Sequence, residues 1–566
     1  DVSFLARFES LDEAICRVDE KGTVTTIGYG ETHIRVAYNR RFALARITVP
    51  RTLEGGFPQA KVNNRIDELV SAKLEELGIP PSEVCSDEVF IRRVTLDTLG
   101  RLPTPEETRA FLSDKSADKR SKLIDRLLAS TEFADFAALK WGDLLRIKAE
   151  FPSNLWPNAV HAYYRWIRDS LAQNKPYDQF VRELLVSSGS NFRDPPANYY
   201  RAMEKRDPVA FAESTALVFM GVRLECARCH GHPNEPWTFD DDVAMGAFFS
   251  QVKFKSTKEW KEEIVYVDPR ITYRHPVTRQ TVVPRFLDGT TPDIPPNTDP
   301  RAVFADWLTS PENPYFAKNI VNRIWFWLFG RGIVHEPDDM HPTNPPSNAA
   351  LLDYLAEELV KNDFDLKSIY RLILNSATYQ QSSETVPGNE EDETYFSHYV
   401  PRRLAAEVLS DAIGDVTQRW DRFESRVPEP YSNWPLGYRA TRMFDGSVNT
   451  PFLEMFGRPP RDTSYECDRD NNPSMRQAIY LVASSTMESK VAGSPRIQAW
   501  IRDKLPDEKI VDELFLLAFS RLPSEQEKAT ALEYLKQNGT SGSARTQAVQ
   551  DLMWAALNSK EFLFQH

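Results

Sequence analysis

The chain has 566 residues and a formal net charge of -13 at pH 7, from 69 lysines and arginines against 82 aspartates and glutamates. This acidic balance excludes the basic surface that binding to nucleic acid or to an anionic membrane requires. No apolar run approaches the roughly 20 residues of a membrane-spanning helix. We therefore expect neither a nucleic-acid partner nor a membrane span. The length predicts several domains. Residue 1 opens no signal peptide, and we expect a chain trimmed from a longer precursor.

Residues 1–50 predict a small β module. Short bursts of β-branched and aromatic residues occupy positions 23–27, 33–38 and 43–50, and glycines separate the first two. This composition is typical of strands joined by turns. The last of these strands ends at Pro50.

From residue 64 the apolar residues follow the period of a helix. Ile66, Val70, Leu74 and Leu77 recur at intervals of three and four residues. Similar patterns predict further helices at 90–100, 122–129, 211–221 and 243–249. We therefore expect a mainly α fold: a multi-domain helical body with a small N-terminal β-sandwich-like module and a short β-containing insertion.

One phrase of the first helical region returns near the end of the chain. Residues 101–107 match residues 521–527, and residues 128–133 match residues 557–562. Such recurrence indicates an internal repeat, which we interpret as a helical hairpin reused for packing. We expect the two copies to bury equivalent side chains, namely Leu102 with Leu522 and Phe133 with Phe562.

The composition shifts again between the helical regions. Residues 263–267 and 280–284 are predicted strands, followed by proline-rich sequence, and Arg301 begins a second helical region. The chain thus divides into four predicted parts: a β module at 1–50, a helical domain at 60–250, a β- and proline-rich connector at 251–300, and a second helical domain at 301–566.

The most specific pattern in the chain is Cys226-Ala227-Arg228-Cys229-His230-Gly231-His232-Pro233. Cys-x-x-Cys-His is the attachment signature of a c-type haem. The thiols of Cys226 and Cys229 would add to the vinyl groups of the porphyrin, and His230 would offer its imidazole to the iron. The pattern therefore predicts one covalent haem c bound by these three residues.

Three other interpretations of the motif stay open. A redox-active Cys226–Cys229 pair would need a thioredoxin-like context of strand and helix, which is missing. A zinc knuckle would need a second ligand pair, but the other cysteines are isolated. A non-haem metal ion could be held by His230 and His232 beside a Cys226–Cys229 disulfide. Besides these three, the cysteine pair could be purely structural.

A haem iron in this motif could take a sixth ligand from elsewhere in the chain. His232 is too close in sequence to His230 to reach the opposite face of the ring. The candidates are Met245, Met340, His341 and His275. A methionine would raise the redox potential and a histidine would lower it, whereas an open position would favour oxygen or peroxide chemistry.

Adjacent carboxylates occur in several loops, but spacing alone does not identify an acid–base pair, because such pairs are defined by separation in space. Asp240–Asp242 and Asp338–Asp339 lie beside predicted turns and helix starts, where carboxylates are usually structural. The polar residues after Cys467, which include Asp468, Arg469 and Asp470, are predicted to form salt bridges that hold the fold.

The order of these phrases resembles a known domain arrangement. "CARCHGHPNEPW" with "FDDDVAMGAFF" resembles the planctomycete cytochrome-c-type domain family. "NPYFAKNIVNRIWFWLFGRGIVHEPDDMHP" and "LFLLAFSRLPSEQE" resemble the planctomycete surface domain family that usually follows it. Residues 14–50 resemble part of a bacterial Ig-like domain.

The resemblance implies an exported protein of the periplasm or cell surface, and so does haem c, which is attached outside the cytoplasm. A monohaem protein of this kind would serve electron transfer or redox sensing with a partner protein that the sequence does not identify. The alternative is a non-haem metal-binding or polysaccharide-associated surface or scaffold protein, or an enzyme acting on a polysaccharide.

Overall fold

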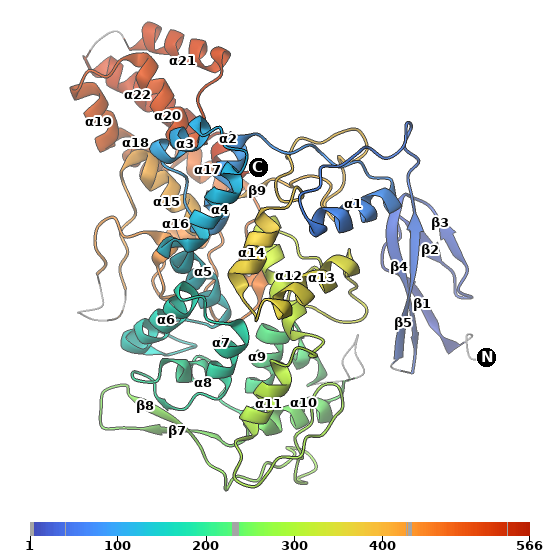
Figure 1. Ribbon diagram of the computed structural model, residues 1–566. Coiled ribbons are helices and arrows are strands. Elements are labelled where there is room, and N and C mark those ends of the chain that lie inside the picture. Colours follow the sequence, from blue (N-terminus) through green and yellow to red (C-terminus); the bar gives the residue numbers. More distant parts are fainter. Residues whose placement is uncertain (1–4, 40, 229–236, 426, 428–432, 540–541) are drawn as a thin grey trace.

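The structure is a computed structural model of the chain and describes residues 5–39, 41–228, 237–425, 427, 433–539 and 542–566. Helices dominate these residues, and the strands are few and mostly short (Figure 1). The predicted mainly α class is therefore confirmed. None of the described helices combines the length and the apolar character that crossing a membrane requires.

The N-terminal module consists of antiparallel strands, which confirms the predicted β character of this segment. It lies beside the first helix, α1, at the edge of the helical body (Figure 1), where Lys73 donates a hydrogen bond to Glu31 at 2.5 Å. One sheet has the order β1-β4-β5, and the other two strands form a separate ribbon. The strands are β1 (Arg7–Ser10), β2 (Cys16–Val18), β3 (Val24–Thr26), β4 (Gly30–Tyr38) and β5 (Arg41–Val49).

The first helical region begins where the apolar period changes. Asn64 and Asp67 form a capping box at the start of α1, and Gly78 ends this helix in the left-handed conformation. The helices predicted from residue 66 to residue 221 are confirmed. This region contains α1 (Arg65–Leu77), α2 (Asp87–Leu99), α3 (Pro105–Ser113), α4 (Lys119–Ala129), α5 (Thr131–Leu144), α6 (Trp156–Ala172), α7 (Tyr177–Leu185), α8 (Asn198–Arg201), α9 (Pro208–Met220) and α10 (Phe239–Gly246).

The connector contains one of its two predicted strands. A small antiparallel sheet has the order β6-β8-β7, from β6 (Gly189–Ser190), β8 (Glu263–Val267) and β7 (Val252–Ser256). The strand predicted at 280–284 is wrong, because this segment makes only an isolated bridge between Thr281 and Arg274. Pro284 lacks the backbone N–H that a longer ladder would need.

The second helical region surrounds α12, whose described side chains are almost all buried. Its C-terminal helices lie at one end of the molecule, with α21 outermost (Figure 1). The region contains α11 (Pro300–Leu308), α12 (Phe316–Phe329), α13 (Ala349–Lys361), α14 (Leu366–Leu374), α15 (Ala406–Thr417), α16 (Pro451–Met455), α17 (Met475–Ala483), α18 (Ser485–Ala492), α19 (Pro495–Arg502), α20 (Asp507–Phe519), α21 (Glu525–Asn538), α22 (Gly542–Leu557) and α23 (Lys560–Leu563).

The hydrophobic core is shared by both helical regions. Trp141 of α5 packs edge-on against Trp327 of α12 at a ring-centroid distance of 6.2 Å. Tyr177 of α7 stacks on Phe316 of α12 at 4.7 Å. A second core cluster joins residues of α2 and α5 to α15 and the C-terminal helices. The residue boundaries that we assigned to the domains stay predictions.

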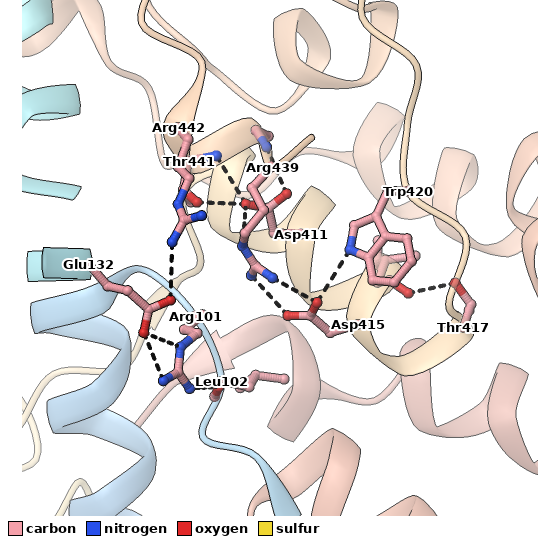
Figure 2. Close-up of polar contacts among 12 residues, drawn as sticks. Arg101, Leu102, Glu132, Asp411, Asp415, Thr417, Trp420, Arg439, Thr441 and Arg442 are labelled. Carbon is pink, nitrogen blue, oxygen red and sulfur yellow. Dashed lines mark hydrogen bonds and ion pairs between the residues drawn. The ribbon is translucent and has the colours of Figure 1, made fainter. Parts of the chain in front are cut away.

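Ion pairs also join the two regions (Figure 2). Glu132 at the start of α5 binds Arg442 at 3.4 Å. Arg439, three residues earlier, binds Asp415 at 2.8 Å and lies 3.5 Å from Asp411, both on α15. The short segment 439–442 is thus clamped between α5 and α15.

The two copies of the repeated phrase make the same ion pairs. Arg101 binds Glu107 at 2.8 Å and Glu132 at 3.0 Å. Arg521 binds Glu527 and Glu561 at 2.7 Å each. The arginine therefore ties the end of one helix to the starts of two others in both copies, which supports the predicted reuse of a packing unit.

The burial of the repeat differs between the copies. Phe133 and Phe562 are both buried, as predicted. Leu102 is also buried, but Leu522 is 54% exposed, so the predicted equivalence of this pair is wrong. Leu102 packs into the second core cluster, whereas Leu522 lies in the turn between α20 and α21.

Candidate functional site

The Cys-x-x-Cys-His motif begins directly after a buried helix. Asp207 caps the start of α9, and Gly221 ends it at φ 70° in the left-handed conformation. The chain then forms the short 3-10 helix η3 (Leu224–Ala227), which contains Cys226. The predicted delivery of the motif by a small-residue helix is confirmed up to this cysteine.

Three groups of the second helical region hold the end of α9. Asn319 of α12 donates to the carbonyl of Val218 at 2.8 Å. Arg323, one turn further on, donates to the carbonyl of Leu217 at 3.0 Å. The backbone N–H of Met340 donates to the carbonyl of Gly221 at 2.8 Å. These donors satisfy carbonyls that the end of a helix leaves without partners, so the position of η3 depends on both helical regions.

Gly221 is required by the space around it as well as by its backbone angle. A Cβ atom at this position would lie 2.9 Å from Asn319 Oδ1 and 3.0 Å from Met340 Sδ. The sulfur of Met340 therefore lies close to the residue that begins the approach to Cys226.

The predicted site residues lie partly outside the described part of the chain. Cys226 is half-buried, and burial, with Glu225 and Asp339 adding to it, raises the pKa of its thiol. Cys229, His230 and His232 belong to residues 229–236, which the structure does not describe. The three-residue haem site and the two-histidine metal site therefore stay predictions.

An ionic frame surrounds η3. Arg223 donates to Asp338 at 2.7 Å, and Asp338, which is fully buried, also accepts from the backbone N–H of Glu466 at 2.8 Å. The Arg223 guanidinium lies 5.3 Å from the ring centroid of Tyr465, whose hydroxyl donates to Glu225. The segment around residue 465 thus docks onto η3 through charged contacts.

Two buried carboxyl groups lie behind the motif. Asp242 of α10 is fully buried, and neither of its carboxyl oxygens accepts a hydrogen bond from a residue that the structure describes. Burial, increased by the neighbouring Glu213, raises the pKa of Asp242 to about 8. Burial likewise raises the pKa of Glu213 of α9 to about 7, although Arg228 of the motif donates to it. Carboxyl groups with pKa values shifted this far are typical of functional sites.

A pocket opens between η3 and the segment that docks on it. Its volume is about 200 Å³, and its walls include charged residues of both, among them Glu213, Arg223, Glu225, Arg228 and Asp462. A histidine that binds a metal commonly donates its second ring N–H to a carboxylate, and the buried carboxyl groups near the pocket could accept such a hydrogen bond. The charged walls fit the apolar face of a porphyrin less well.

The four candidates for a sixth iron ligand differ in their contacts and in their burial. His275 accepts the backbone N–H groups of Val277 and Thr278 with Nδ1, and its Nε2 contacts Asp240 at 3.1 Å, so both ring nitrogens are engaged. His341 contacts Thr343 through Nδ1 at 3.0 Å. Met245 is fully buried in the core. Met340 is also buried in the core, and its sulfur lies beside Gly221, which leads into the motif.

The structural roles expected for adjacent carboxylates are found at most of these positions. Asp241 completes the capping box of α10 with Thr238 and binds Arg285 at 2.7 Å. Asp338 is held by Arg223, as described above. Arg469 forms the predicted salt bridges, to Glu407 and Asp143, both at 2.7 Å.

Asp242 is the exception, and Glu213 was not expected at all. Glu213 is the only charged residue inside α9, whose other residues are apolar or small. A lone acid on such a helix is the signal that could have identified it. Among the described residues no group of three or more histidine, cysteine, aspartate or glutamate side chains could hold a metal ion.

Comparison with known proteins finds two family models that match in tandem. Residues 65–254 match the family described as PSCyt2, a protein of unknown function (DUF1549). Residues 300–535 match the family described as PSD1, a protein of unknown function (DUF1553). No curated protein and no solved structure matches the chain. The chain is therefore similar, over most of its length, to two families of unknown function whose names match the cytochrome-c-type and surface domains that its sequence resembles.

Proposed function

We propose that this protein is a monohaem c-type protein for electron transfer or redox sensing, with Cys226 and Cys229 as thioether anchors and His230 as the proximal ligand. The observation that carries the proposal is the place of the complete motif: it starts on η3, directly after the end of α9 that both helical regions hold in position. The family name of the matching region supports the same assignment.

The chain's own residues would support such a centre in distinct ways. The haem would supply a one-electron couple. The Glu213–Asp242 pair would accept hydrogen bonds from the ligand side and tune its basicity. Met340 would be the sixth ligand, which would raise the redox potential. Because charged residues line the pocket beside η3, the exposed edge of a haem bound there would meet a partner protein through ionic contacts.

We extend the proposal to export and to the N-terminal module. Haem c attachment implies a location outside the cytoplasm, in the periplasm or at the cell surface. The likeness of residues 14–50 to an Ig-like domain supports an extracellular role for the β module. Association with a polysaccharide stays an expectation from the sequence.

A non-haem metal site is the second candidate. It is favoured by the charged walls of the pocket and by the unpartnered oxygens of Asp242. Here His230 and His232 would bind the ion, and Cys226 and Cys229 would form a disulfide.

Variants separate the two candidates through the absorption spectrum and the metal content of the protein. For haem c, Cys226→Ala with Cys229→Ala abolishes the pyridine haemochrome of covalent haem, and His232→Ala leaves it intact. His230→Ala alters the ligation of the iron. For the non-haem site, no Soret band is present in the native protein, and His230→Ala and His232→Ala each remove the metal found by elemental analysis. The second pattern would contradict the haem proposal.

A further inference from the structure

A larger pocket lies where the two helical regions meet, apart from the motif. Its volume is about 680 Å³, within the range of small-molecule sites. Residues of α2, α5, α12 and α15 line it, together with the segment around residues 401–405 and the segment 466–473. The lining combines aromatic rings with charged side chains, and it includes one amine, that of Lys140 on α5.

Lys140 reaches into this pocket between two aromatic rings. Its Nζ atom lies 5.1 Å from the ring centroid of Phe136 and 5.2 Å from that of Trp327. No hydrogen bond or ion pair joins this amine to any residue in the described part of the chain. The amine thus contacts aromatic rings and has no carboxylate partner among these residues, in contrast to Lys148, which binds Asp462 at 2.5 Å.

The absence of a counterion has a structural cause. Three of the carboxylates around the pocket, one each from α2, α5 and the segment 466–473, are already bound by an arginine. Asp97 is bound by Arg402, Glu466 by Arg323 at 2.8 Å, and Asp143 by Arg469 at 2.7 Å. Because the arginines offset the charge of these three carboxylates, none of the three acts as a counterion for Lys140.

Burial, reinforced by the charge of Arg402, consequently lowers the pKa of Lys140 to about 7, while Asp97 and Glu466 only partly oppose it. About half of the amine is therefore neutral at pH 7. A lysine that is desolvated and placed near another cation is the form in which this side chain acts as a nucleophile.

We propose that Lys140 is the nucleophile of a site for a small carbonyl compound, an aldehyde or a ketone, which it binds as an imine in this pocket. The amine nitrogen attacks the carbonyl carbon, and a C–N bond forms. The carbonyl oxygen then leaves as water with the two hydrogens of the amine. Hydrolysis reverses the step and releases the ligand. The reaction needs no oxidant or reductant, and it does not depend on the cofactor proposed at Cys226.

Reductive trapping tests this site directly. The full chain is incubated with glyceraldehyde and sodium cyanoborohydride over a range of pH, and peptide mapping by mass spectrometry locates the reduced adducts. At pH 7 we expect the adduct at Lys140 to form on the order of tenfold or more faster than at Lys148, whose amine is held by Asp462. The rate at Lys140 should reach half its maximum near pH 7.

Two variants complete the test. Lys140→Met keeps the length of the side chain and should remove the fast adduct while the protein unfolds at an unchanged denaturant concentration. The matched control, Lys148→Arg, should retain the fast adduct. Labelling of Lys140 at the rate of Lys148, or a fast adduct that persists in Lys140→Met, would overturn the proposal and leave Lys140 a packing residue.

Discussion

Asp242 and Glu407 are both fully buried carboxyl groups, yet their surroundings are opposite. Arg469 binds both oxygens of Glu407, at 2.7 and 3.0 Å, and Arg458 lies 3.4 Å away. Burial alone would raise the pKa of Glu407, but Arg469 and Arg458 outweigh it and lower the pKa. Asp242 accepts no hydrogen bond from any described residue, and burial raises its pKa to about 8.

The contrast separates two uses of buried charge. The Glu407 cluster joins α15 to α5 and to the segment around residue 469, and both of its carboxylates, Glu407 and Asp143, are bound by arginines, as in an ion-pair network that holds the fold. Asp242 lies on the helix that follows the motif and opposes folding when it is ionised. Such groups are typical of functional sites, so Asp242 supports the site that we propose at η3.

The largest change in the free energy of unfolding is expected for a substitution in the Glu407 cluster. Glu407→Gln removes the carboxylate that is paired with the buried Arg458 and one of the two carboxylates that bind Arg469, and it should lower the free energy of unfolding at pH 7 by about 3–5 kcal/mol. Urea denaturation measures it. The exposed Glu454→Gln is the control and should change the free energy by less than about 0.5 kcal/mol. A cost for Glu407→Gln below about 1 kcal/mol would mean that the cluster does not stabilise the fold.

Asp242→Asn should change the free energy of unfolding in the opposite direction and stabilise the protein. In the apoprotein at pH 8, we expect a gain in stability of about 1–3 kcal/mol, because the variant removes an unpartnered buried charge. The control is Asp241→Asn on the same helix turn, which weakens a capping box and should cost about 1 kcal/mol. Destabilisation by Asp242→Asn at pH 8 would show that this carboxylate has a partner.

The pH dependence of the two effects should also be opposite. Folding raises the pKa of Asp242. The protonated carboxyl group therefore contributes fully to the stability of the fold below pH 3.8, and this contribution is lost as the pH rises through about 8. The advantage of Asp242→Asn should therefore grow between pH 5 and pH 9. The pKa of Glu407 is lowered, so the cost of Glu407→Gln should shrink as the pH falls below 4.5. Denaturation at several pH values measures how the stability change of each variant depends on pH. If the two changes shifted in the same direction with pH, the contrast between Asp242 and Glu407 would be wrong.

The smallest expected effect is the coupling between Asp242 and Glu213. If burial and mutual repulsion raise both pKa values, removing one carboxyl group relieves the other. The gain of the double variant Asp242→Asn, Glu213→Gln at pH 8 should therefore fall short of the sum of the single gains by about 0.5–1 kcal/mol. Strict additivity in a double-mutant cycle would show that the two groups titrate independently.

Local sequence patterns predicted the elements but not their surroundings. The helices from residue 66 to residue 221 follow from the apolar period and from caps such as Asn64 and Gly78. The strand predicted at 280–284 did not form because this segment pairs with its neighbour only through the bridge at Thr281. Such pairing depends on the tertiary structure and cannot be seen in the local sequence. Leu522 repeats Leu102 in sequence, yet only Leu102 has neighbours from α15 to cover it.

The candidate site was predictable only in part for the same reason. The spacing of Cys226, Cys229 and His230 is visible in the sequence. The environments of Asp242 and Lys140 are not, because they depend on which arginines have already bound the surrounding carboxylates. Those arginines come from segments hundreds of residues away, such as Arg402 and Arg469.

The intact mass of the protein purified from its native host tests the central claim most directly. Covalent haem at Cys226 and Cys229 predicts a mass higher than that of the polypeptide by one haem, which remains after denaturation and acid extraction. A mass lower by two hydrogens, with no visible chromophore and with a metal found by elemental analysis, would contradict the claim and identify a disulfide beside a non-haem ion.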